Sequence, residues 1–217
     1  MKDELYQQEK NLMQIARKYY TNLPYHNFYH VLQTLNNADN IIQRVKKDGI
    51  KVDELVVKHA VLFHDSGYDK DPKKLGFDDK EEYSASIATK ELSKLRYPKN
   101  HVDKVASCIL ATKRHGNFKT VEQKIVRAAD LAGLMSDYRT FRENTLALKR
   151  EYEFFTGKRV TEAIWKEQLK ELRNTMNFYL SQDINLTAEH DDPKTGESIF
   201  HRNLKRNFAR FLEDEES

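Results

Sequence analysis

Apolar residues recur every three or four positions along most of this chain, which is the spacing of one face of an α-helix. Residues 52–65, for example, place Leu55, Val56, His59 and Phe63 on one side. Residues 121–136 repeat the pattern. No stretch shows the strict alternation of a half-buried strand bounded by hairpin residues. The pattern therefore predicts an all-α protein.

Glycine and proline mark the ends of the periodic segments. The chain has only 7 glycines and 4 prolines, and nearly all lie between those segments. Two irregular stretches, 66–79 and 183–196, are candidate site loops or lids, and 183–196 is the candidate lid over the core. The helices are expected at about residues 3–19, 28–47, 53–65, 80–95, 101–113, 121–136, 138–155, 160–180 and 197–213.

The length favours one domain. A chain of 217 residues with 39% hydrophobic content can bury one large core but is short for two. We therefore expect a single helical bundle over residues 1–217. Its metal-site core would span about residues 25–135, with the helices at about 138–213 packed on that core.

The composition of the chain bears on its binding partners and on its cellular compartment. The 37 Lys and Arg residues are interspersed with 34 Asp and Glu residues, so a sequence-specific nucleic-acid partner is not expected. Cys108 is the only cysteine and lies in an apolar run, which fits a core position in a reducing compartment. The polar start of the chain lacks a signal-peptide pattern, and no apolar run reaches ~18 residues. We expect a cytoplasmic protein that does not enter membranes.

The stretch AVLFHDSGYD, residues 60–69, places two potential metal ligands after an apolar helix. His64 and Asp65 are adjacent, so on a continuing helix their side chains would diverge by ~100°. Gly67 allows the backbone to leave helical geometry. Asp65 can then turn toward the group that His64 faces, so the helix is expected to end here.

Two further histidines occur in YHNFYH, residues 25–30. His26 and His30 have the spacing found in zincin proteases, but Asn27 occupies the position of the required glutamate. Asn27 is a good N-cap, so the next helix should start there with His30 in its first turn. His30 is thus the better ligand of the two. A structural role for such a histidine is the alternative.

RAADLAGL, residues 127–134, supplies a carboxylate among small residues. Asp130 could be a surface residue or could pair with Arg127. The small residues around it, however, allow another helix to come close, and a carboxylate buried at such a contact needs a cation near it. Together, His30, His64, Asp65 and Asp130 would give a divalent ion nitrogen and oxygen ligands from three helices. Such a set would leave positions open for water and substrate.

This ordered set resembles the HD superfamily of metal-dependent phosphohydrolases. The motifs YHNFYH, FHDSGYD, KEEYSA, AADLAGL, KREYEF and RNLKRNF are similar, more narrowly, to a bacterial group of predicted HD-domain hydrolases. The resemblance runs from about residue 12 to about residue 210. It implies that His30, His64, Asp65 and Asp130 hold the metal, which could be Mn, Fe, Co, Ni, Zn or Mg.

The resemblance also implies catalytic and second-metal positions. Glu81 and Glu82 fall where the group has an acidic pair, and Asp69 falls where related nucleotide hydrolases have a catalytic acid. Tyr68 replaces a position that is often acidic in those enzymes. His115 lies in a region where two-metal HD proteins have a histidine, but Thr112 occupies the expected spot. One metal is therefore favoured over two.

These observations favour a phosphohydrolase acting on a small phosphate ester or anhydride, in particular a nucleotide. A bound divalent ion lowers the pKa of water and polarises a phosphoryl oxygen, so no side-chain nucleophile is needed. Serine-hydrolase, P-loop and dinucleotide-binding motifs are accordingly absent from the sequence. The alternative is a sensor that binds a metal and a nucleotide without turnover. The sequence does not determine the oligomeric state.

Polar residues near the expected metal set could serve this chemistry. Asp69, Glu81 or Glu82 could act as general acid or base. Phosphate charge could be neutralised by His26, Lys113, Arg114 and His115. Each of these residues could equally lie at a solvated helix end.

Overall fold

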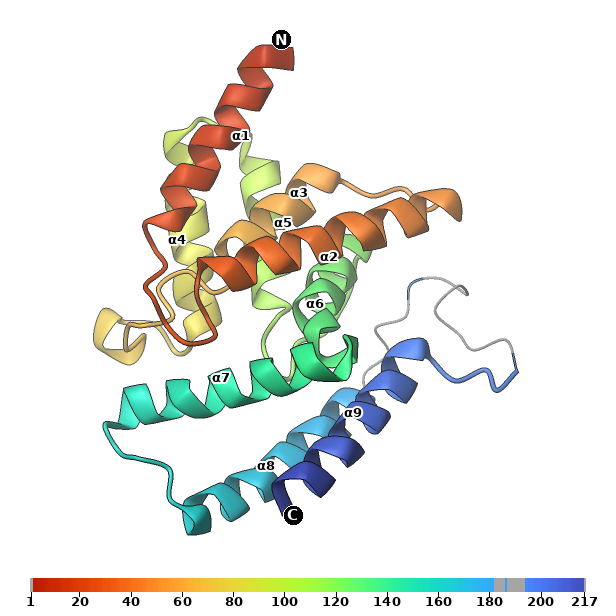
Figure 1. Cartoon of the computed structure of the whole chain (residues 1–217). Helices are drawn as coiled ribbons and strands as arrows, with labels where there is room; N and C mark the ends of the chain where they lie inside the picture. The colour runs from red at the N-terminus through yellow and green to blue at the C-terminus, as the bar shows by residue number, and fades with distance from the viewer. Residues whose placement is uncertain (1, 182–185, 187–193, 217) are drawn as a thin grey trace. The chain divides into compact units, whose positions relative to one another are not determined.

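The computed structural model describes residues 2–181, 186 and 194–216, and the regular elements in these ranges are all helices (Figure 1). The all-α prediction is confirmed. In chain order the helices are α1 (Lys2–Arg17), α2 (Phe28–Lys47), α3 (Glu54–Phe63), the 3-10 turn η1 (Lys73–Leu75), α4 (Lys80–Lys94), α5 (Lys99–Leu110), α6 (Val121–Leu131), the 3-10 turn η2 (Ala132–Met135), α7 (Tyr138–Thr156), α8 (Glu162–Leu180) and α9 (Ile199–Glu216).

The observed helices differ from the expected ranges mainly at their ends. The segment expected at 121–136 is an α-helix only to Leu131 and then tightens into η2. The expected site loop 66–79 is irregular apart from η1. Most of the expected lid, 183–196, lies outside the described residues.

The chain divides into two compact units, Met1–Asp130 and Leu131–Ser217. The first unit contains α1 to α5 and nearly all of α6. The second contains η2 and α7 to α9. The expectation of one domain over residues 1–217 stays a prediction, as does the packing of the later helices on the core.

α3 is the central helix of the first unit. It contacts α1, α2, α4 and α5 (Figure 1). Most residues of α3 are buried, and Val57, Val61 and Phe63 are fully buried. A short helix that is apolar on nearly all sides belongs inside a core. Because α3 is enclosed in this way, the His64-Asp65 pair that follows it is held at a fixed depth in the unit.

A chain of polar contacts fastens the middle of α3 to its neighbours. The His59 side chain is fully buried, with Nδ1 2.8 Å from His101 Nε2 and Nε2 2.8 Å from Glu9 Oε2. Tyr97 donates its hydroxyl hydrogen to Glu9 Oε1 at 2.9 Å. α1, α3 and α5 are therefore joined through one buried imidazole, whose two ring nitrogens both have partners.

This arrangement predicts a pH-dependent contribution to stability. Burial, followed by the positive charge of His59, lowers the pKa of His101 below its ordinary value of 6.5. The unfolded chain then binds more protons than the folded chain near pH 6, so the free energy of unfolding should fall as the pH drops below about 6.5.

His101→Gln should flatten this dependence between about pH 7 and pH 5, measured by urea unfolding at each pH. His115→Gln, which changes an exposed histidine, is the matched control and should keep the wild-type slope. Equal slopes for wild type and His101→Gln would show that His101 is not the group responsible.

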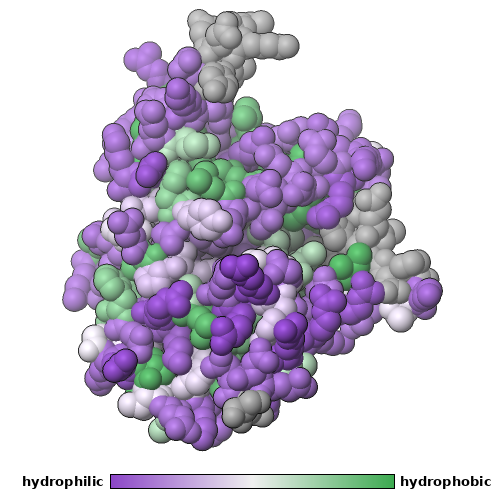
Figure 2. Space-filling view, in the orientation of Figure 1, coloured by the Kyte–Doolittle hydropathy of each residue, from purple (hydrophilic) through white to green (hydrophobic). Residues whose placement is uncertain are grey.

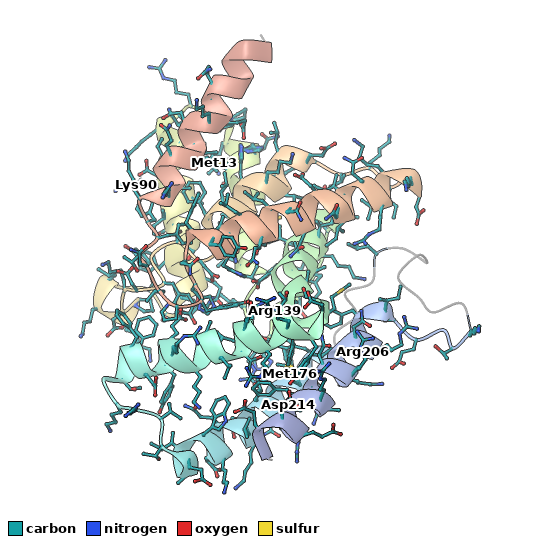
Figure 3. All side chains as sticks on the ribbon, in the orientation of Figure 1. Met13, Lys90, Arg139, Met176, Arg206 and Asp214 are labelled. Carbon is teal, nitrogen blue, oxygen red and sulfur yellow. The ribbon has the colours of Figure 1, made fainter. Side chains whose placement is uncertain are left out.

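The second unit packs α9 against η2, α7 and α8. Asn207 donates its side-chain N–H groups to the carbonyl oxygens of Leu134 and Ser136 at 3.2 and 2.8 Å. Phe141 and Phe211 meet edge to face, with ring centroids 6.0 Å apart. Of the residues labelled in Figure 3, Arg139, Met176, Arg206 and Asp214 belong to this unit.

One face of the molecule is strongly polar (Figure 2). The face in Figure 2 is mostly hydrophilic, with small separate hydrophobic areas. This agrees with a chain in which 33% of the residues are charged. None of the described helices is both long and apolar enough to span a membrane.

Candidate metal centre

Four side chains from three parts of the first unit converge on one point. His30 comes from the first turn of α2, His64 and Asp65 from the end of α3, and Asp130 from the end of α6. One potential ligand atom from each lies within 4.8 Å of the other three. The four residues that the sequence singled out are therefore brought together.

Asn27 fixes His30. Its side-chain oxygen accepts hydrogen bonds from the backbone N–H groups of Tyr29 and His30, at 2.8 and 3.2 Å. This N-cap starts α2 at Phe28, as the sequence predicted, and places His30 in the first turn. The His30 side chain is buried, and its Nε2 lies 3.3 Å from Asp130 Oδ1.

Gly67 turns the chain after the His-Asp pair. α3 ends at Phe63, and Gly67 has a φ of +73°, which an L-residue rarely adopts. Its N–H donates to the Tyr19 carbonyl oxygen at 2.9 Å. The predicted helix end is thus confirmed. The turn lets Asp65 face the same point as His64, with Asp65 Oδ2 3.1 Å from His64 Nε2.

His64 presents Nε2 to the cluster because its other ring nitrogen is occupied. Nδ1 lies 2.8 Å from the Val61 carbonyl oxygen, which can only accept, so Nδ1 carries a proton. Nε2 is buried and has no hydrogen bond of good geometry, although it lies 3.1 Å from Asp65 Oδ2 and 3.4 Å from Asp130 Oδ1. An imidazole lone pair facing two carboxylates fits a cation between them.

Asp130 faces the cluster more closely than it faces Arg127. Its Oδ1 lies 3.3 and 3.4 Å from Nε2 of His30 and His64, whereas its Oδ2 lies 3.9 Å from Arg127 Nη1. Arg127 is buried and donates to the Thr112 carbonyl oxygen at 2.8 Å. The sequence left a surface position or an Arg127 pair as alternatives. The structure shows a largely buried carboxylate with Arg127 at its outer oxygen.

Without a metal, a proton on His64 can compensate the two carboxylates. Burial would lower the pKa of His64, but the neighbouring Asp65 and Asp130 raise it to about 10. Burial likewise opposes ionisation of Asp130, yet its contacts with His30 and His64 hold its pKa below the usual range. A cation entering the cluster must therefore displace a proton, so its affinity should increase with pH.

Lys80 is a component of the site that the sequence analysis missed. Its ammonium donates to Asp65 Oδ1 at 2.7 Å and lies 3.5 Å from Glu81 Oε1. It also lies 4.6 Å from the centre of the Tyr68 ring. Burial would lower the pKa of Lys80, but Asp65 and Glu81 raise it. Its position in the first turn of α4 gave no signal, because its main partner lies fifteen residues earlier.

The three predicted acid-base residues have different surroundings. Glu81 is buried and approaches the metal cluster through Lys80. Asp69 pairs with Lys70 at 2.8 Å. Glu82 pairs with Lys113 at 2.9 Å and accepts from the backbone N–H of Asp78. Glu81 is thus the one most closely linked to Asp65 among these contacts.

The predicted phosphate-binding residues lie in different surroundings as well. His26 stacks on Tyr68, with ring centroids 3.7 Å apart, and its ring lies 6.0 Å from that of His30. Lys113 lies between Asp79 and Glu82, at 2.7 and 2.9 Å. Arg114 and His115 are exposed in the turn after α5. His26 therefore lies at the cluster, whereas the ammonium of Lys113 is compensated by two carboxylates.

Comparison with protein-family models matches residues 27–132 to the HD domain. The matched region starts at the N-cap of α2 and contains all four residues of the metal cluster. No curated protein matches the sequence. The narrower resemblance to one bacterial group of HD hydrolases stays a prediction.

Proposed function

Since residues 27–132 form an HD domain, we propose that this protein is a metal-dependent phosphohydrolase. Its substrate would be a small phosphate ester or anhydride, and in particular a nucleotide. The observation that carries the proposal is the buried, unsatisfied Nε2 of His64, which faces two carboxylates and a second imidazole. Such an arrangement is costly unless it holds a positive charge, either a proton on His64 or a metal ion that takes its place.

His30, His64, Asp65 and Asp130 would hold one divalent ion. When bound, the ion would supply a more acidic water and a polarised phosphoryl oxygen. The protein contributes the fixed ligand set: Val61 orients His64, Asn27 orients His30, and Arg127 lies at the outer oxygen of Asp130. These contacts would keep the ligands in place between turnovers.

Proton transfer needs a carboxylate near the reacting phosphate. Asp69, Glu81 and Glu82 remain the proposed residues for this step, and Glu81 has the strongest structural support because it shares Lys80 with Asp65. His26 would contact substrate at the rim of the cluster. Arg114 and His115 are exposed and could approach phosphate, whereas Lys113 would have to exchange Asp79 and Glu82 for it.

The proposal predicts phosphate release that depends on a divalent metal. Purified protein should be stripped with chelator and assayed on nucleoside mono-, di- and triphosphates, with Mn²⁺, Co²⁺, Ni²⁺ and Mg²⁺ supplied in turn. We expect turnover of at least one nucleotide at about 1 s⁻¹ or faster with the preferred metal, against none with chelator. Tight nucleotide binding without phosphate release would instead support the sensor function.

A further inference from the structure

The two oxygens of Asp65 face different cations. Oδ2 points to the metal cluster, 3.1 Å from His64 Nε2 and 3.7 Å from His30 Nε2. Oδ1 accepts from the Lys80 ammonium at 2.7 Å. Because a carboxylate can bridge two cations through its two oxygens, Asp65 has the geometry of a bridging ligand whose second partner is already supplied by the chain.

The surroundings of the Lys80 ammonium resemble a small cation site. Besides Asp65 Oδ1, it has Glu81 Oε1 at 3.5 Å and the face of the Tyr68 ring at 4.6 Å. The carboxylates of Asp65 and Glu81 are 3% and 10% exposed, so they are poorly hydrated and require a positive charge. A divalent ion bridging the same two oxygens would have to displace this ammonium.

We propose that the Lys80 ammonium occupies the position of a second metal ion and thereby limits this HD site to one. The inference rests on the proposed metal-dependent function, and it assigns to Lys80 a positioning role. The ammonium satisfies Asp65 Oδ1, directs Oδ2 to the metal, and repels a second divalent ion at short range.

Removing the positive charge should therefore change metal stoichiometry. In Lys80→Met the side chain keeps a similar length, but the oxygens of Asp65 and Glu81 lose their shared cation. We expect Mn²⁺ binding, measured by equilibrium dialysis of stripped protein, to rise from about one to about two ions per chain, the second bound more weakly. Lys80→Arg keeps the charge and should still bind one.

Lys94→Met is the matched control. Lys94 is also on α4 and pairs with the carboxylate of Glu91 at 2.7 Å, so its loss likewise removes the cation beside a buried acidic group, but away from the cluster. Glu91 keeps the hydrogen bond from the Tyr19 hydroxyl at 2.8 Å. This variant should bind one Mn²⁺. If Lys80→Met does not fold, as judged by circular dichroism, Lys80→Gln provides the same test because it also removes the charge.

The outcomes separate this inference from the proposed function. One Mn²⁺ in wild type and two in the neutral Lys80 variant support the role of Lys80. One ion in both proteins, or two ions in wild type, would overturn that role while leaving a metal-dependent hydrolase intact. No bound ion in wild type would contradict the metal site itself. Two ions in Lys94→Met would show that the loss of any lysine beside a carboxylate on α4 recruits Mn²⁺, which also overturns the inference.

Discussion

Asp130→Asn is expected to lower kcat/KM for phosphate release at least about a thousandfold, or about 4 kcal/mol of transition-state stabilisation. Asparagine keeps the size of the side chain but removes the charge from the oxygen that lies 3.3 and 3.4 Å from the two imidazoles. Metal content of the purified variant should fall in parallel. Phosphate assays and elemental analysis on the same sample measure both effects.

Thermal unfolding gives a reading of the same variant that does not depend on substrate. Added metal should raise the Tm of wild type but not that of Asp130→Asn, because stabilisation by a ligand requires binding to the folded state. Asp39→Asn is the control: Asp39 pairs with Lys58 at 3.0 Å on the surface, and its variant should retain metal and activity. Wild-type metal content and turnover in Asp130→Asn would remove Asp130 from the site.

Gly67→Ala should lower the free energy of unfolding, because the backbone turn beside the proposed metal site requires a glycine. The φ of +73° strains any L-residue, and an added Cβ would lie 2.5 Å from Tyr83 Cε1. The positive φ costs about 1–2 kcal/mol and the overpacking about 1–3 kcal/mol. Urea unfolding should therefore show a loss of about 2–5 kcal/mol in the free energy of unfolding, together with reduced metal content.

Gly76→Ala separates the two causes. Gly76 has a φ of +85°, but no atom lies within 4 Å of its added Cβ, so this variant has the backbone strain without the clash. It should lose only about 1–2 kcal/mol and keep its metal. Equal losses in the two variants would show that contact with Tyr83 contributes nothing to the loss of stability.

Local sequence patterns were sufficient for most of the helices and for three of the four residues of the proposed metal site, His30, His64 and Asp65. The spacing of apolar residues located α2 and α3, and the cap at Asn27 and the flexibility of Gly67 predicted how His30 and Asp65 enter the site. These features depend on residues a few positions apart, so they can be recognised without knowing the tertiary structure. Asp130 required more, because its local sequence left a surface position or a pair with Arg127 open. Its place in the ordered set of His and Asp residues, and then the resemblance to HD proteins, favoured it as a ligand.

Charge pairing between distant segments could not be predicted in the same way. Lys80 meets Asp65 across the loop that contains η1, and Lys113 meets Asp79 and Glu82 from the end of α5. Long polar side chains have several possible partners, and the choice depends on how the helices pack. The sequence offered Lys113 as a residue for phosphate or for a solvated helix end, whereas the structure gives its ammonium two carboxylate partners.

Reconstitution of the stripped protein tests the central claim most directly. Mn²⁺ is added in steps to a known concentration of metal-free protein, and the rate of phosphate release is followed with the nucleotide that the substrate panel identifies. We predict that activity is absent at the start, rises with each addition, and reaches a plateau near one ion per chain. Full activity in the metal-free protein would contradict the assignment of His30, His64, Asp65 and Asp130 as a catalytic metal centre.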